Sequence, residues 1–244
     1  MTESVYNQET QKKNETIRFT TLINKLTFMH DPDKINVVLL DIDGCILNNL
    51  PRQREIINRE LKKQYAIHRI PEQSELNYKT IYCLLDHVNV SENDESNIRE
   101  EFLRLFLQQE YLLHDKSIQN AHKSIERILT LGYEIWLITG RHSNPKSSMK
   151  DGTIDSLRKH GINVDNKRIK LLMKKDPSDE DAIYKMNLIQ EITAEPAVQI
   201  GAFIDNESQN LRLAAKFLPD SLLIRFESAQ SKSVPFSGYT LKNW

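Results

Sequence analysis

Short apolar runs bounded by turn residues recur along this 244-residue chain, and they limit its fold more than any other feature. The first run, KINVVLL at residues 34–40, is rich in β-branched side chains, which is typical of a parallel strand buried on both faces. Comparable runs lie at residues 133–138, 169–173, 198–204 and 221–226. We therefore expect five buried strands in one parallel sheet.

Helical patterns separate the later runs. The clearest covers residues 117–131, where apolar residues recur on one face and Gly132 stands at the position of a C-terminal cap. Further helices are expected at residues 153–160, 181–193 and 207–217. Strands that alternate with helices in this way predict an α/β fold built on a doubly wound, Rossmann-like parallel sheet.

Residues 51–115 break the alternation, because they contain helical patterns and no convincing strand. These patterns lie near residues 51–66, 74–88 and 95–113. An all-helical block between the first two strands indicates a small cap inserted over the top of the sheet. The expected domains are an N-terminal extension at 1–33, an α/β core at 34–50 and 116–244, and a helical cap at 51–115.

The N-terminal extension contains two kinds of sequence. Residues 1–16 are polar and are expected to be frayed. Residues 17–29 carry scattered apolar positions and are expected to form a short helix that packs on the domain.

The composition is that of an ordinary globular protein. Charged residues make up 27% of the chain and the formal net charge is −1, so no basic excess indicates a dedicated nucleic-acid binder. The two cysteines, Cys45 and Cys83, form no CxxC pair, which makes a reducing, cytoplasmic compartment the expected one. No apolar run approaches the roughly 20 residues of a membrane helix. No secretory signal is expected either, because the N-terminus lacks an apolar centre, although a specialised secretion signal stays open.

Polar side chains follow three of the expected strands at the point where each strand ends. Asp41 and Asp43 follow the first strand in the motif DIDG. Thr139 follows the second strand in ITGR, and Asp205 follows the fourth in IDNE. The carboxyl ends of parallel strands lie at one edge of a sheet, and open α/β sheets bind their ligands there. The sequence therefore predicts a site that contains carboxylates and a hydroxyl.

Such a set of side chains suits phosphoryl transfer. Carboxylate oxygens are the ligands that Mg²⁺ prefers, and this ion also binds substrate phosphate. One carboxylate can attack phosphorus and form an aspartyl-phosphate, and a second one can protonate the leaving oxygen and then activate water. A hydroxyl and a lysine can hold the phosphoryl oxygens while charge shifts in the transition state.

The order of these motifs resembles that of the haloacid dehalogenase superfamily of phosphatases. That family has DxDG after its first strand, Thr or Ser after the second, a downstream Lys and a final acidic cluster. Here these features correspond to DIDG, ITGR, a lysine within residues 174–185, and IDNE. The resemblance covers residues 34–50 and 117–227. It implies a haloacid dehalogenase-like core with a helical cap inserted between the first and second motifs.

The resemblance also implies roles for single residues. Asp41 would be the nucleophile, and Asp43 the general acid and base. Mg²⁺ would be held by the Asp41 carboxylate, the Asp43 backbone carbonyl and the Asp205 carboxylate. Thr139 would hydrogen-bond the transferring phosphoryl group. Three further residues are expected to contact the substrate, and the first of them also lets the chain turn tightly past the phosphate: Gly44, Gly140 and Arg141.

The phosphate-holding lysine has three candidates, Lys174, Lys175 and Lys185. Some branches of the family place this lysine early in a helix after a loop rich in Asp and Pro, and the segment KKDPSDEDAIYK favours Lys185 on this basis. The acidic cluster leaves a second question open, because Asn206 stands where many relatives carry another acid. Either the Asn206 amide oxygen or the Glu207 carboxylate can assist the metal, and Glu207 alternatively only complements the helix dipole.

These features predict a Mg²⁺-dependent phosphatase that hydrolyses phosphate monoesters through an aspartyl-phosphate, with a small phosphorylated metabolite or nucleotide as the favoured substrate. The alternative is a macromolecular substrate, either a phosphoprotein, for example one with phosphotyrosine, or a polynucleotide 3′-phosphate. KKDPSDEDAIYK also resembles the end-healing polynucleotide phosphatase branch. A non-catalytic binding protein on the same fold is the weaker hypothesis, because binding alone does not need all the motifs together. No membrane partner is expected, and the oligomeric state stays open.

Overall fold

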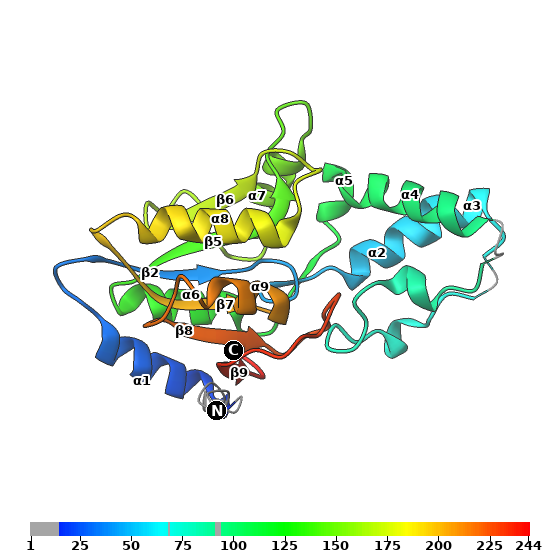
Figure 1. The fold of residues 1–244 in the computed structure, drawn as a ribbon. Helices are drawn as coiled ribbons and strands as arrows, with labels where there is room; N and C mark the ends of the chain where they lie inside the picture. Colours follow the sequence, from blue (N-terminus) through cyan, green and yellow to red (C-terminus); the bar gives the residue numbers. More distant parts are fainter. Residues whose placement is uncertain (1–14, 68, 91–93) are drawn as a thin grey trace, which may run out of the picture.

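The computed structural model describes residues 15–67, 69–90 and 94–244, and within them the centre of the molecule is a seven-stranded sheet (Figure 1). The strand order is β1-β9-β8-β7-β2-β5-β6, and the neighbouring strands are parallel. The five expected strands are present as β2 (Ile35–Leu40), β5 (Glu134–His142), β6 (Ile169–Lys174), β7 (Val198–Asp205) and β8 (Leu222–Phe226). The predicted α/β fold with a doubly wound parallel sheet is therefore confirmed.

Both faces of the sheet are covered by helices, which explains why its strands are apolar at successive positions. In β2, Val38 and Leu40 belong to a buried cluster that they share with helices α1 (Phe19–Met29), α6 (Ala121–Thr130) and α7 (Met149–Lys159). The alternate residues Val37 and Leu39 belong to a second cluster, shared with α8 (Asp181–Thr193) and α9 (Ser208–Ala214). Successive side chains of a strand point to opposite faces, so a continuous apolar run marks a strand buried on both sides.

Two short strands at one edge of the sheet were not expected. β1 (Glu15–Ile17) pairs with β9 (Tyr239–Leu241), and β9 pairs with β8. The expectation of a frayed segment is wrong for Glu15 and Thr16, which belong to β1, and its other residues, 1–14, lie outside the described residues. Each strand has only three residues and pairs with a segment from the far end of the chain, so no local pattern indicates it.

Within the segment between β2 and β5, residues 49–115 form a mostly helical insert beyond the carboxyl ends of the strands (Figure 1). Its helical elements are α2 (Leu50–Ile56), a π-helical turn (Ile57–Leu61), α3 (Lys62–Gln64), α4 (Glu95–Phe106) and α5 (Gln109–Leu112). The buried apolar residues of the insert form a cluster distinct from the two clusters of the sheet. The insert therefore has a small core of its own.

One helix predicted in the insert, at residues 74–88, is wrong. The chain there forms turns and two short 3₁₀ helices, Gln73–Glu75 and Leu84–His87. A side chain takes the place of helical hydrogen bonds in this segment. Gln53 donates a hydrogen bond to the Tyr82 carbonyl at 3.1 Å and accepts one from the Leu84 amide at 2.6 Å. These backbone groups are therefore paired with a side chain and not within a helical turn.

Two short strands connect the insert to the sheet. β3 (Leu47–Asn48) and β4 (Lys116–Ser117) pair antiparallel where the chain enters and leaves the insert. β4 takes the place of the first turn of the helix predicted at 117–131, so that α6 begins at Ala121. None of the helices in the described part of the chain is long and apolar enough to cross a membrane.

Candidate active site

Asp41 and Asp205 lie side by side at the carboxyl edge of the sheet. β2 and β7 are parallel neighbours with Leu40 opposite Ile204, so the next residue of each segment comes to the same place. The Lys185 ammonium bridges the two carboxylates, at 2.7 Å from Asp41 Oδ1 and 2.8 Å from Asp205 Oδ2. All three side chains are buried. The structure thus brings together two expected metal ligands and the favoured lysine.

Burial and charge set the ionisation of this trio. Burial raises the pKa of Asp41 well above its usual value; the Lys185 ammonium opposes the rise, and the Asp205 carboxylate adds to it. Burial lowers the pKa of Lys185, but the two carboxylates outweigh burial and leave this pKa above its usual value. The lysine therefore stays protonated and can hold an anion.

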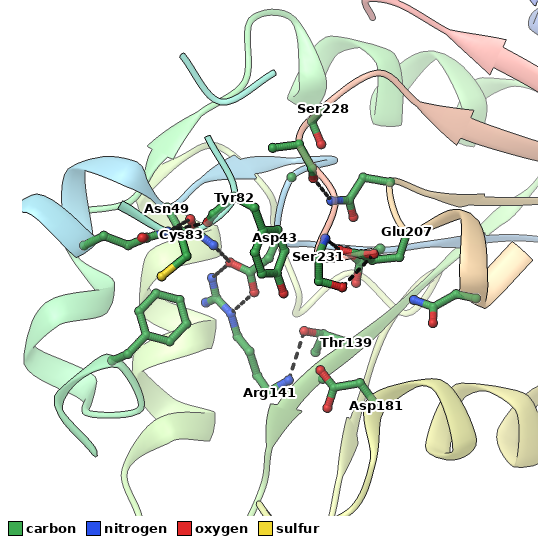
Figure 2. A pocket seen from close by; sticks show the side chains of 18 of the residues that line it. Asp43, Asn49, Tyr82, Cys83, Thr139, Arg141, Asp181, Glu207, Ser228 and Ser231 are labelled. Carbon is green, nitrogen blue, oxygen red and sulfur yellow. Dashed lines mark hydrogen bonds and ion pairs between the residues drawn. The ribbon is translucent and has the colours of Figure 1, made fainter. Parts of the chain in front are cut away.

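Asp43, two residues after Asp41, is held by arginines. Arg141 donates from Nε to Asp43 Oδ2 and from Nη2 to Oδ1, both at 2.8 Å (Figure 2). Arg52 donates to Oδ1 at 3.2 Å and Asn49 at 3.4 Å. Burial raises the pKa of Asp43, but Arg141, with Arg52 and Asn49, outweighs burial and holds the pKa well below its usual range. Asp43 is therefore ionised in this structure.

A second carboxylate, Asp115, contacts the same two arginines. Arg141 Nη2 lies 2.8 Å from Asp115 Oδ2, and Arg52 Nε lies 3.1 Å from Oδ1. The Arg52 guanidinium also stacks 3.8 Å above the Phe106 ring. Arg52 and Asp115 were missed in the sequence, because they lie at the two ends of the helical insert and carry no motif. The only signal was their position just inside the two ends of that insert.

Thr139 and Gly140 lie near the end of β5 and line the same pocket as Asp41. The Thr139 hydroxyl is buried and accepts a hydrogen bond from the Arg141 amide at 3.2 Å. At Gly140 a Cβ atom would collide with the Asp181 carboxylate, so any larger residue there would displace Asp181. Both residues therefore lie at the edge of the sheet where the phosphate is expected.

The other two candidate lysines lie away from the two carboxylates. The Lys174 ammonium donates to the Pro177 and Asp179 carbonyls in the loop before α8 and to the carboxylate of Asp181, the first residue of α8, at 2.6 to 3.1 Å. Lys175 is exposed. Of the three candidates, Lys185 is the one that reaches Asp41.

The neighbours of Asp205 are engaged by the loop that follows β8. Asn206 donates to the Ala229 carbonyl at 2.8 Å. Glu207 accepts hydrogen bonds from the Ser231 amide at 2.7 Å and from its hydroxyl at 3.0 Å (Figure 2). Both side chains therefore fasten this loop over the site, and a role of either one at a metal stays a prediction.

A pocket of about 590 Å³ lies between the sheet edge and the insert. Asp43, Thr139, Arg141 and Glu207 approach it from the sheet side, and Tyr82 and Cys83 from the insert (Figure 2). The insert wall is mostly apolar and includes Tyr78, Ile81, Tyr82, Phe102, Leu103 and Phe106. The pocket therefore places ionised groups opposite an apolar surface.

The donor atoms at the sheet edge fit Mg²⁺. Asp41 and Asp205 supply hard carboxylate oxygens from adjacent strands, and these oxygens already gather one cation, the Lys185 ammonium. Among the described residues, no cluster of three or more His, Cys, Asp and Glu side chains could hold a metal. The ion would therefore rest on two carboxylates, the Asp43 carbonyl, water and substrate phosphate, which is the kind of incomplete shell that Mg²⁺ accepts.

Comparison by sequence finds no relative: no protein-family model matches the chain, and no curated protein matches it. Comparison by structure does find similar folds. A haloacid dehalogenase-like hydrolase from Streptococcus pneumoniae is 10% identical, with a TM-score of 0.54 over 85% of this chain and 93% of that chain. A haloacid dehalogenase superfamily hydrolase of subfamily IA from Geobacter sulfurreducens is 13% identical, with a TM-score of 0.52 over 87% and 94%.

A third similar structure is a predicted phosphatase from Clostridium acetobutylicum, which is 9% identical with a TM-score of 0.53 over 86% of this chain and 94% of that chain. At such identities the likeness concerns the fold. The chain has the haloacid dehalogenase-like fold that its motif order indicated.

Proposed function

We propose that this chain is a Mg²⁺-dependent phosphatase that hydrolyses phosphate monoesters through an aspartyl-phosphate on Asp41. The bridge from Lys185 to Asp41 and Asp205 at the pocket carries this proposal. A carboxylate beside a fixed ammonium can receive a phosphate group and attack its phosphorus. Solved hydrolases and a predicted phosphatase with the same fold support the reaction class.

In the first step Asp41 attacks phosphorus while the Lys185 ammonium and the Thr139 hydroxyl hold the phosphoryl oxygens. The bond from phosphorus to the leaving oxygen breaks, and Asp43 gives that oxygen a proton. The negative charge of the bound phosphate would oppose the effect of Arg141 and Arg52 on Asp43, and so raise the pKa of Asp43 and let it carry this proton. In the second step the Asp43 carboxylate takes a proton from water, and the water oxygen displaces Asp41 from phosphorus.

Mg²⁺ bound by Asp41, the Asp43 carbonyl and Asp205 would offset the negative charge of the phosphate and of the attacking carboxylate. In the structure, the Lys185 ammonium is the cation that holds the Asp41 and Asp205 carboxylates together. Lys185 alone does not offset the additional negative charge of a bound phosphate. We therefore expect turnover to depend on added Mg²⁺ and to be lost in a chelator.

A small phosphorylated metabolite or nucleotide is the substrate class that the pocket favours. The apolar wall of the insert suits the organic part of such a molecule. Of the cationic side chains described around the pocket, Arg52, Arg141, Lys174 and Lys185 are paired with carboxylates, and Lys232 is not. One unpaired cation offers little attraction to a long polyanion such as a nucleic-acid strand.

Hydrolysis of 4-nitrophenyl phosphate with and without Mg²⁺ tests the reaction, and Asp41→Asn tests the nucleophile. The variant is expected to lose at least about 1,000-fold in kcat, because no other group replaces the attacking carboxylate. Lys175→Ala, which removes an exposed lysine of the same region, serves as the control and should keep wild-type activity. Unaltered turnover by Asp41→Asn would contradict the assignment.

A substrate panel separates the classes of phosphate ester. Nucleoside monophosphates and sugar phosphates are expected to give a higher kcat/KM than a phosphotyrosine peptide or a 3′-phosphorylated oligonucleotide. The reverse order would favour a macromolecular substrate. If no ester is hydrolysed in Mg²⁺, the result would contradict the proposed phosphatase and favour a non-catalytic binding protein on this fold.

A further inference from the structure

Four side chains form a closed ring of alternating charge between the insert and the sheet. Asp43 contacts Arg141 at 2.8 Å and Arg52 at 3.2 Å. Asp115 contacts the same two arginines, at 2.8 Å and 3.1 Å. The Asp115 side chain has no exposed surface, and those of Arg52 and Arg141 are 1% and 4% exposed. The Asp43 side chain, which faces the pocket, is 27% exposed. Water therefore hardly screens the attractions between Asp115 and the two arginines, which are buried on both sides.

Asp115 is the one member of this ring that does not line the pocket. We propose that Asp115 is a positioning residue, which fixes Arg141 and Arg52 in the orientation in which they hold the Asp43 carboxylate toward the leaving oxygen of the substrate. This inference rests on the proposed function, since it concerns the proton transfer by Asp43 in the phosphatase reaction.

The planar guanidinium explains how a carboxylate behind the arginines orients one in front of them. Arg141 uses Nε and Nη2 for Asp43, and the same Nη2 also donates to Asp115. Two partners on one rigid fork fix its plane, and the fork then fixes the plane of the Asp43 carboxylate. Without the charge of Asp115, two buried guanidiniums would face one carboxylate, and their mutual repulsion would turn them apart.

The ring also lies at the junction of the insert and the sheet. Asp115 directly precedes β4, and Arg52 lies in α2, close after β3. Arg141 belongs to β5 of the sheet. The ring therefore joins both connections of the insert to a core strand, so the placement of the insert and the orientation of Asp43 are set together. A purely structural Asp115 would support stability and leave the proton transfer unaffected.

Two esters of similar size separate positioning from structural support. The leaving group of 4-nitrophenyl phosphate departs without a proton, whereas the alkoxide of benzyl phosphate needs the proton of Asp43. In Asp115→Asn we expect kcat/KM for benzyl phosphate to fall by about tenfold or more, and kcat/KM for 4-nitrophenyl phosphate by less than about threefold. The constant kcat/KM is compared because it reports the first step, whereas kcat also contains the second step, which both esters share and in which Asp43 acts as base. Asp43→Asn should show the same selectivity more strongly, and the double variant no further loss. Asp151→Asn, on the exposed side of α7, is the control and should match the wild type.

Equal losses of kcat/KM for the two esters in Asp115→Asn, or no loss for either ester, would overturn the inference and leave the proposed function standing. A wild-type protein that hydrolyses neither ester would contradict the proposed function, and the inference with it. If thermal melting shows that Asp115→Asn is unfolded, Asp115→Glu takes its place, because it keeps the ring neutral and displaces the carboxylate by one methylene. The same selectivity is expected there, and equal losses would again refute the positioning role.

Discussion

At the scale of single residues, Gly44 is a position where the backbone and the neighbouring side chains both favour glycine. Its φ is +82°, and a Cβ atom there would lie 2.6 Å from Asn206 Nδ2 and 2.8 Å from Ser228 Oγ. Gly161 has a similar φ of +83°, but its nearest neighbours would lie 3.7 Å away, at His122. The two glycines therefore share the backbone requirement and differ in crowding.

Gly44→Ala is expected to lower the free energy of unfolding by about 2–4 kcal/mol, against about 1 kcal/mol for Gly161→Ala. The difference arises because alanine at position 44 strains the backbone and also displaces Asn206 and Ser228. Urea unfolding measures both values, and 4-nitrophenyl phosphate hydrolysis should fall in Gly44→Ala alone. Equal losses of stability in the two variants would show that Asn206 and Ser228 move aside without lowering the free energy of unfolding.

His142 makes the stability depend on pH. Its Nδ1 atom is buried and has no hydrogen-bond partner in the described part of the chain. Burial lowers the pKa of His142, and the charge of Lys174 lowers it further, so the folded pKa lies below the unfolded value of about 6.5. The unfolded chain therefore binds more protons between the two values, and stability falls as the pH drops through this window.

Melting temperatures between about pH 7.5 and pH 5 test this dependence on His142. The wild type is expected to lose more stability on acidification than His142→Asn, which has no group to protonate at this position. The pKa of His160 is also lowered by burial, but this residue is present in both proteins and cancels in the comparison. Parallel curves for the two proteins would contradict the assignment.

At the scale of elements, Gln53 holds together the part of the insert that has little regular structure. Gln53→Ala leaves the Tyr82 carbonyl and the Leu84 amide without their partner and should cost about 1–3 kcal/mol of unfolding free energy. Faster hydrogen exchange should be confined to the segment around residues 82–88. Gln73→Ala, at an exposed position, is the control. If Gln53→Ala lowers the free energy of unfolding as little as the control does, water replaces the hydrogen bonds of the Gln53 side chain.

The elements that could be predicted from the sequence are those that carry their signal locally. The run at residues 35–40 is apolar because it is buried on both faces, and this is visible without knowing its neighbours. The helix expected at 74–88 fails because a side chain from another helix, Gln53, takes its backbone partners. β1 escapes prediction because β9, from the far end of the chain, stabilises it.

The same distinction holds for the candidate site. Asp41, Thr139 and Asp205 could be placed together from the sequence, because parallel topology brings the ends of their strands to one edge. Arg52 and Asp115 could not, because their meeting depends on the path of the insert between β3 and β4. The residues that orient Asp43 are thus set by tertiary structure and not by a motif.

At the scale of the whole molecule, Trp244 links the C-terminal segment to the loop that carries Asp43. Its indole Nε1 donates to the Cys45 carbonyl at 2.7 Å, and its ring stacks on Phe226 with centroids 5.1 Å apart. Trp244→Ala should cost about 3–5 kcal/mol of unfolding free energy and also lower activity. Trp244→Phe keeps the stacking and loses the hydrogen bond, so a cost of about 1–3 kcal/mol is expected. Wild-type stability of Trp244→Ala would contradict this link.

The most direct measurement of the central claim is rapid acid quenching of Asp43→Asn mixed with 4-nitrophenyl phosphate and Mg²⁺. In this variant the first step needs no acid, whereas the second step lacks its base, so the phosphorylated enzyme should accumulate. We predict a burst of about one 4-nitrophenol per enzyme, with the phosphoryl group on the peptide that contains Asp41. The double variant Asp41→Asn/Asp43→Asn should show neither. A phosphoryl group on another residue, or turnover without any covalent phosphoenzyme, would contradict the proposed nucleophile.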